Sequence, residues 1–296
     1  MSTPYKIPTS LWANRTLHLP PSLLEAYRRV LNRRGLTDQA RSQTPSNKKL
    51  VGGVSCEETE AHFAHRYGVS ACRLVGTLID PSRALGVASR ELLTIFSHGE
   101  VALLDAPCGT GAASLGVLCS LAELRRHRSL PTLSLNVKIH AADISDTARE
   151  IYMSMVAECQ RELAKVGISV DVTPVCWDAT SPVKTRDVVE EFRNTARTAD
   201  QVVIVANFGA VGGSDIYEHI KSSLEHIKIV FAGRGTVLFV ESDGRKPTKF
   251  LERILTRAKQ VLPGETPTDF RHSYHWYDAF NATRRDCRIV TLLLPR

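Results

Sequence analysis

Two different hydrophobic patterns divide the chain near residue 100. Before that point, apolar residues recur at the spacing of amphipathic helices, and polar loops separate these segments. After it, short runs rich in Val, Ile and Leu alternate with helical patterns. The change of pattern predicts an N-terminal helical cap over residues 1–99 and an α/β domain over residues 100–296.

The helices expected in the first part have recognisable ends. Pro20 and Pro21 precede the first of them and Gly35 follows it, which are start and stop signals. Ser55 followed by Glu58 has the spacing of a capping box. The predicted helices cover residues 23–34, 55–67, 70–79 and 81–97, and residues 37–53 are expected to form a loop.

Seven strands are predicted in the second part. A helical pattern follows each of the first five, and this alternation implies right-handed crossovers and a parallel sheet covered on both faces. The link between the last two strands is too short for a helix, so they must pair antiparallel. The strands are expected at residues 101–104, 137–142, 169–175, 201–206, 235–240, 270–277 and 288–294. The fold class is therefore α/β, with a seven-stranded sheet and an antiparallel C-terminal hairpin.

Composition excludes several classes of protein. The chain has 296 residues, of which 43% are hydrophobic and 23% charged, as in an ordinary globular protein. No apolar run approaches the roughly 20 residues that cross a bilayer, so no membrane association is expected. The seven cysteines are scattered and form no C-x-x-C pair, which argues against a disulfide framework or a zinc site. The N-terminus lacks the pattern of a secretory signal, so a cytoplasmic location is expected.

The charge is moderately basic. The net charge is +7, and 13 basic and 8 acidic residues give the first 100 residues a net charge of +5. Such an excess is typical of a solvated basic face, and it also fits a surface for an anionic partner.

The segment Asp105–Ser114 has the composition of a ligand-binding turn. Its sequence DAPCGTGAAS follows an apolar strand and precedes a predicted helix. Gly109 and Gly111 tolerate positive φ and let the backbone approach a ligand, and the helix N-terminus supplies unpaired N–H donors. A dinucleotide-binding fingerprint requires a third glycine where this chain has Ser114. Asp105 at the strand end favours a ligand with a positive charge over a phosphate.

This segment resembles motif I of the class I S-adenosylmethionine-dependent methyltransferases. That motif is an acidic residue followed by Gly-x-Gly-x-Gly; Asp105, Gly109 and Gly111 match it, and Pro107 replaces the first glycine. The resemblance covers about residues 100–296 and implies a Rossmann-like methyltransferase sheet with S-adenosylmethionine as the cofactor. The residues of this segment that it assigns to the cofactor are Asp105, Ala106, Pro107, Gly109 and Gly111.

Two further carboxylates follow the next two strands. Asp143 can accept both ribose hydroxyls of a nucleoside, and with Ile144 it is expected to bind the cofactor; a helix N-cap is the alternative for Asp143. The resemblance implies that Asp178 accepts from the adenine amine while the Ala179 N–H donates to a ring nitrogen, although an ordinary turn also explains Asp178. Parallel strands end at one edge of the sheet, so these groups are expected to meet Asp105 there.

Asn207 and Phe208 come directly after the fourth strand. The resemblance implies that this strand end faces the transferred methyl group and that Asn207 also contacts the cofactor. Members of the superfamily that methylate exocyclic base amines usually have Asn/Asp-Pro-Pro-aromatic here, and the missing prolines argue against that acceptor. The alternative is a flexible loop with Gly209, Gly212 and Gly213.

No motif identifies a catalytic base. The catalytic candidates are Asn207, Phe208 and Glu241, the last of which follows the fifth strand. His62 and His65 lie with Glu58 on one helix face, which is typical of an amphipathic helix rather than a metal site, so no metal is expected. An alternation of His272, Tyr274, His275 and Tyr277 fits a half-buried strand better than a substrate wall.

The function expected from the resemblance is methyl transfer from S-adenosylmethionine. The basic excess slightly favours an anionic acceptor such as RNA or DNA, and a small-molecule O- or N-methyltransferase is the alternative. A non-catalytic module that binds S-adenosylmethionine or S-adenosylhomocysteine, and an NAD(P)-dependent reductase, are the other classes. The sequence leaves the oligomeric state open.

Overall fold

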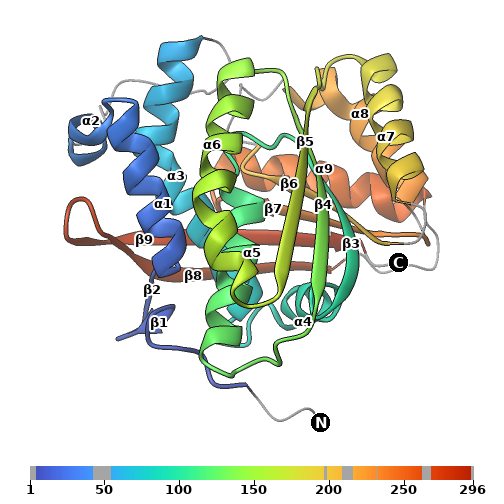
Figure 1. Ribbon diagram of the computed structural model, residues 1–296. Helices are drawn as coiled ribbons and strands as arrows, with labels where there is room; N and C mark the ends of the chain where they lie inside the picture. The colour runs from blue at the N-terminus through green and yellow to red at the C-terminus, as the bar shows by residue number, and fades with distance from the viewer. Residues whose placement is uncertain are drawn as a thin grey trace.

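A nine-stranded sheet with helices on both faces forms the centre of the molecule (Figure 1). The computed structural model describes residues 5–42, 55–196, 199–208, 216–231, 233–261 and 268–294. The helices are α1 (Pro21–Arg33), α2 (Thr37–Arg41), α3 (Cys56–Ile79), α4 (Gly86–Ile95), α5 (Ala112–Arg126), α6 (Asp146–Ala164), α7 (Pro182–Thr195), α8 (Ile216–Phe231) and α9 (Arg245–Val261). The strands are β1 (Trp12–Ala13), β2 (Thr16–Leu17), β3 (Gly99–Asp105), β4 (Leu135–Asp143), β5 (Ile168–Cys176), β6 (Asp200–Ala206), β7 (Thr236–Glu241), β8 (Thr268–Asp278) and β9 (Thr283–Leu294).

The order of the strands reverses at β3. The sheet runs β1-β2-β8-β9-β7-β6-β3-β4-β5, so β4 and β5 follow on one side of β3 while β6 and β7 lie on the other. Strands β3 to β7 are parallel, and β9 runs antiparallel to both β7 and β8. The predicted parallel sheet and its closing hairpin are confirmed. In open α/β sheets, a crevice for ligands forms where the strand order reverses.

The predicted count of seven strands is wrong by two. The seven expected strands are present, but β1 and β2 extend the sheet beyond β8, with Leu17 aligned with Trp276. Each added strand has only two residues, which is too short to produce a period-2 pattern in the sequence. β2 pairs with the edge of β8 and β1 pairs with β2, and these pairings supply the backbone hydrogen bonds that define them.

Two helices predicted over 55–67 and 70–79 are one continuous helix, α3. Ser55 caps it by accepting a hydrogen bond from the Glu58 N–H at 3.1 Å, as the capping pattern predicts. Gly68 lies in the gap between the two predicted helices, and a Cβ atom at this position would lie 2.8 Å from the Trp276 ring. The glycine therefore allows close packing within the helix. The loop predicted over 37–53 begins with the short helix α2, and residues 43–54 lie outside the described part.

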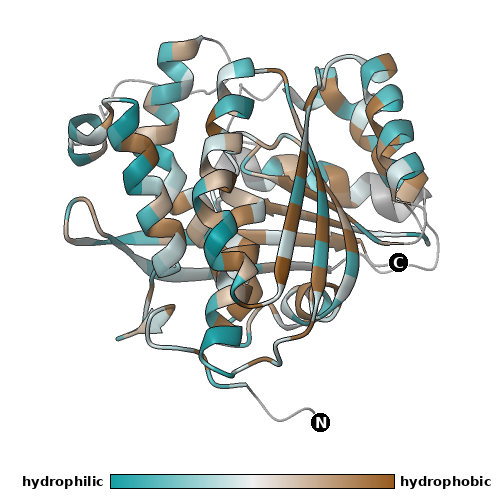
Figure 2. Cartoon of the chain, in the orientation of Figure 1, coloured by the Kyte–Doolittle hydropathy of each residue, from teal (hydrophilic) through white to brown (hydrophobic). Residues whose placement is uncertain are grey.

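Alternate residues of the central strands pack against opposite helical layers. Val101 and Leu103 of β3 belong to one hydrophobic cluster with residues of α1, α3, α5 and α6. Ala102 and Leu104 belong to a second cluster with residues of α7, α8 and α9. Figure 2 shows hydrophobic residues concentrated along the central strands, while the outward faces of α6 and α7 are mainly hydrophilic. The sheet is thus covered on both faces, as expected for parallel strands.

Helix α3 is held close to the sheet layer through α5. A Cβ atom at Gly116 of α5 would lie 3.0 Å from the Ala71 carbonyl oxygen of α3, so the two helices cross at short range. This contact places the first half of α3 over the carboxyl ends of the parallel strands. All seven cysteines are free thiols, and no helix in the described ranges is both long and apolar enough to span a bilayer.

The packing of Gly68 is tested by Gly68→Ala. Alanine favours a helix interior over glycine by about 1 kcal/mol, yet its methyl group would overlap the Trp276 ring. We expect the overlap to dominate and the free energy of unfolding to fall by about 1–3 kcal/mol, measured by urea denaturation. Gly86→Ala is the control, because a Cβ atom there meets nothing within 4 Å. A Gly68→Ala variant as stable as the wild type would contradict this account.

Candidate functional site

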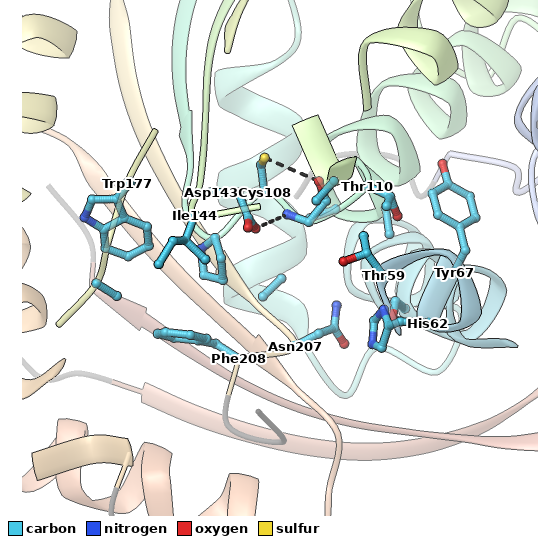
Figure 3. A pocket seen from close by; sticks show the side chains of 18 of the residues that line it. Thr59, His62, Tyr67, Cys108, Thr110, Asp143, Ile144, Trp177, Asn207 and Phe208 are labelled. Atoms are coloured by element: carbon cyan, nitrogen blue, oxygen red, sulfur yellow. Dashed lines mark hydrogen bonds between the residues drawn. The ribbon is translucent and has the colours of Figure 1, made fainter. Parts of the chain in front are cut away.

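A cavity lies at the carboxyl ends of the parallel strands. This cavity has a volume of about 250 Å³, and the ends of β3, β4, β5 and β6 contribute to its wall together with α3 (Figure 3). Eight residues predicted from the sequence line it: Pro107, Gly109, Asp143, Ile144, Asp178, Ala179, Asn207 and Phe208. Four predicted residues, Asp105, Ala106, Gly111 and Glu241, are not among its lining residues.

The two glycines after β3 have different roles. Both have positive φ, +49° at Gly109 and +86° at Gly111, a backbone conformation that glycine adopts without steric cost. A Cβ atom at Gly111 would lie 2.8 Å from the Tyr152 ring, so this glycine allows the turn to pack on α6. A Cβ atom at Gly109, which lines the cavity, would meet nothing within 4 Å. Gly109 is therefore the position that leaves space for a ligand.

Asp143 connects the loop after β3 to the end of β4. Its Oδ2 accepts a hydrogen bond from the Gly109 N–H at 2.9 Å, and its Oδ1 accepts one from the Ser145 N–H at 2.9 Å. A carboxylate has about four acceptor sites, so each oxygen retains capacity for a ligand hydroxyl. Burial raises the pKa of Asp143, and the hydrogen bonds from Ser145 and Gly109 act against that rise. Ile144, next along the chain, lies at the rim with 55% of its surface exposed.

Asp105 lies beneath the cavity instead of in its wall. The residue is fully buried, and neither carboxylate oxygen has a hydrogen-bond partner among the described residues. Burial raises its pKa to about 8, and the nearby Asp143 charge acts in the same direction while Ser114 acts against it. Asp105 is therefore protonated at neutral pH. Of the three strand-end carboxylates expected to meet at this edge, Asp143 and Asp178 line the cavity and Asp105 does not.

The end of β5 contributes an aromatic side chain and an acidic turn. Trp177 is buried, and its indole N–H donates to the Thr185 hydroxyl at 2.9 Å. The Asp178 Oδ1 accepts from the Thr180 N–H at 2.9 Å and from the Thr180 hydroxyl at 2.7 Å. These contacts are those of an Asx turn, and they leave Oδ2 without a partner in the described part of the chain. Asp178 and Ala179 both lie in the wall.

The end of β6 is supported by a buried carboxylate on β7. The Phe208 N–H donates to the Glu241 Oε1 at 2.6 Å, and Glu241 is only 1% exposed. This contact orients Phe208, which lines the cavity, but keeps Glu241 itself out of the wall. Asn207 adopts a positive φ of 59°, which asparagine tolerates better than most residues. Gly209, Gly212 and Gly213, named in the flexible-loop alternative, lie outside the described residues.

Helix α3 supplies part of the wall that the motifs did not reveal. Thr59, His62 and Ser70 line the cavity from this helix. Burial lowers the pKa of His62 to about 4, and the charges of Arg66 and Arg73 lower it further, so the ring is neutral at pH 7. The helical spacing of His62 was visible in the sequence, but packing between distant segments places it in the wall of the same cavity as Asn207 (Figure 3).

Other wall residues were also missed, and other histidine candidates lie elsewhere. Cys108 and Thr110 stand within the quoted Asp105–Ser114 motif and Trp177 directly precedes Asp178, so all three could have been included on that ground. His272 and Tyr274 on β8 share hydrogen bonds with the Ser82 hydroxyl at 3.0 Å each and do not line the cavity. Among the residues that the structure describes, no group of three potential metal ligands gathers at any point.

Comparisons with known proteins assign no family. No protein-family model matches the chain, and no curated protein matches it. Among solved structures, it resembles a precorrin-8w decarboxylase from Methanobacterium thermoautotrophicum with 14% identity and a TM-score of 0.37, covering 70% of this chain and 88% of that one. It also resembles a candidate RNA methyltransferase from Pyrococcus horikoshii with 15% identity and a TM-score of 0.33, covering 72% and 86%. At these TM-scores the overlap is too loose to carry a conclusion about activity.

The protonated state of Asp105 predicts a pH dependence of stability. Its pKa is about 8 in the folded chain and near 3.8 when unfolded, so the folded state binds more protons between these values. The Asp105 contribution to the free energy of unfolding therefore falls as pH rises through this window. Asp105→Asn removes this dependence, and we expect its stability relative to wild type to rise by about 1–3 kcal/mol between about pH 5 and about pH 8.5.

Chemical denaturation at several pH values measures this change. Asp171→Asn is the matched control, because Asp171 is an exposed carboxylate on β5. A stability difference between Asp105→Asn and wild type that stays constant across the range would contradict a raised pKa at Asp105.

Proposed function

We propose that the chain is an S-adenosylmethionine-dependent methyltransferase whose cofactor binds in the cavity at the carboxyl edge of the sheet. The observation that carries the proposal is the convergence of Gly109, Asp143 and Asp178, from the ends of three adjacent parallel strands, on one cavity. The order of the strands, with its reversal at β3 and its reversed last strand, also agrees with the fold that the resemblance implies.

The residues present fit a nucleoside with a zwitterionic tail. In this proposal Asp143 accepts from the ribose hydroxyls, and Asp178 with the Ala179 N–H binds the adenine edge. The tail carboxylate lies near Ala112 and Ala113, which line the cavity at the start of α5. No side chain caps this helix, so the N–H donors of its first turn are available to an anion. Two wall carboxylates disfavour a dinucleotide pyrophosphate at the same place.

In this proposal the main contribution of the chain is to align the reacting groups, and acid–base chemistry contributes less. When bound, S-adenosylmethionine supplies an activated methyl group on a sulfonium. Phe208, held by Glu241, and Asn207 form the wall at the β6 end, where an acceptor would be aligned. Alignment of this kind lowers the barrier by reducing the entropy lost in the reaction. His62 is neutral and can take part in a hydrogen bond with the acceptor.

The ion pairs of α1 favour a small-molecule acceptor over RNA or DNA. Arg29 and Arg33 both pair with Glu158, and Arg34 pairs with Glu60. These arginines contribute to the basic excess of the first 100 residues, yet acidic partners neutralise them locally. Phosphate binding by these side chains would require the existing pairs to break, which reduces the electrostatic gain.

The open space at Gly109 is tested by Gly109→Ala. The added methyl group would take up open space at a residue that lines the cavity, so we expect the affinity for S-adenosylhomocysteine to fall by about tenfold or more in titration calorimetry. Gly35→Ala is the control, since Gly35 also has a positive φ and open space but lies outside the cavity. Both variants lose similar backbone stability, so equal affinity in the two would count against a ligand at Gly109.

The role of Asp143 is tested by Asp143→Ala. Loss of charge-assisted hydrogen bonds to the ribose should weaken S-adenosylhomocysteine binding by about 1.5–3 kcal/mol. The melting temperature should also fall, because the Gly109 and Ser145 amides lose their acceptor. Asp171→Ala is the matched control at an exposed site. An unchanged dissociation constant would remove Asp143 from the cofactor site.

Methyl transfer itself separates an enzyme from a binding module. We expect wild-type protein to transfer labelled methyl groups from S-adenosylmethionine to a small-molecule fraction of a cell extract, and Asp143→Ala to transfer far fewer. Binding of the cofactor without any transfer would favour the non-catalytic module.

A further inference from the structure

A partly buried arginine determines how Asn207 faces the cavity. Arg73 lies on α3, and its Nη1 donates a hydrogen bond to the Asn207 Oδ1 at the end of β6. A guanidinium group has only donors, so the atom it contacts must be the amide oxygen. The contact therefore identifies which end of the Asn207 amide is the oxygen and which end is the nitrogen.

The remaining end of this amide is a hydrogen-bond donor available to a ligand. Asn207 lines the cavity, and no described residue accepts a hydrogen bond from its Nδ2. In Figure 3 the amide nitrogen points towards the loop with Cys108 and Thr110, and the oxygen points the opposite way. A donor at this position binds an oxygen acceptor and cannot accept a hydrogen bond from an amine.

The charges around Asn207 are positive on balance, because Arg66 and Arg73 face the single carboxylate of Glu241 among the described groups that act on Arg73. Arg73 forms no ion pair with any carboxylate in the described part of the chain, and its Nε is buried without a hydrogen-bond partner. The Glu241 carboxylate, whose Oε1 accepts from the Phe208 N–H, favours the charged form of Arg73, whereas the charge of Arg66 acts against it. His62, on the same side of the cavity, is neutral. An anionic oxygen bound beside Asn207 would therefore balance the positive charge of the nearby arginine side chains.

We propose that the ligand group bound at Asn207 is an anionic oxygen, as in a carboxylate or a phosphate, and that Arg73 is the positioning residue that presents the Asn207 amide as its donor. Assigning this group to the methyl acceptor rests on the proposed function, whereas the donor at Asn207 does not. A donor at Asn207 does not suit an exocyclic amine as the acceptor, and the missing prolines after Asn207 disfavour the same acceptor.

The proposal is tested with three small aromatic probes, since Phe208 lies beside Asn207 in the wall. Benzoate, phenyl phosphate and benzylamine are titrated into the full-length protein without cofactor, and dissociation constants are measured by NMR. We expect at least one of the two anions to bind about tenfold or more tighter than benzylamine, and the stronger anion identifies the class. Failure of both anions to bind, or tighter binding of benzylamine, would overturn the proposal.

Asn207→Asp is the main variant, because aspartate also tolerates positive φ but has no donor. It should weaken binding of the preferred anion by about tenfold or more and strengthen binding of benzylamine. Asn194→Asp, an exposed residue on α7, introduces the same charge away from the cavity and should change neither value. Retention of the anion preference in Asn207→Asp would contradict the assignment.

The positioning role of Arg73 is tested through selectivity. Arg73→Met frees the amide to rotate, so the ratio of anion to benzylamine affinity should fall, and Arg73→Lys, which keeps a donor, should restore much of it. A purely structural role would change stability without changing this ratio. Binding of S-adenosylhomocysteine is measured separately. Anion binding through Asn207 without any cofactor binding would contradict the methyl-transfer function and leave the donor site intact.

Discussion

The hydrogen bond from the Gly109 amide to the Asp143 carboxylate is the contact on which the candidate site depends. It joins the turn after β3 to the end of β4, and the second Asp143 oxygen accepts from Ser145 at the start of α6. One buried carboxylate thus fixes two loops and a helix start around the cavity. Because burying a charge is costly, the two amide donors are also what allows the carboxylate to remain there.

Most of the fold was predictable because its periodicity is strong. The parallel strands are apolar runs separated by helical patterns, and strand alternation at Val101 to Leu104 matches the two helical layers. The exceptions depend on tertiary contacts. β1 and β2 are too short for any pattern; they form because β2 pairs with β8 and β1 pairs with β2. Gly68 lies between the two helices predicted over 55–67 and 70–79, and its packing on Trp276 explains a glycine inside one continuous helix.

The site was predictable where strand ends alone decide position. Asp143, Asp178 and Asn207 follow strands that end at one edge, and all three line the cavity. Asp105 follows the same rule but is buried beneath the turn, because the direction of its side chain depends on how the glycine loop folds over it. His62 and Arg73 come from α3, more than 130 residues before Asn207, and only the packing of α3 on α5 brings them to the site.

A crystal structure of the protein with S-adenosylhomocysteine tests the central claim most directly. The account predicts that the nucleoside occupies the cavity at the carboxyl edge, with its ribose hydroxyls hydrogen-bonded to Asp143 and its adenine beside Asp178 and Ala179. It also predicts that Asn207 keeps its amide oxygen on Arg73. A nucleoside bound elsewhere on the chain, or a cavity that remains without ligand at saturating concentration, would contradict the account.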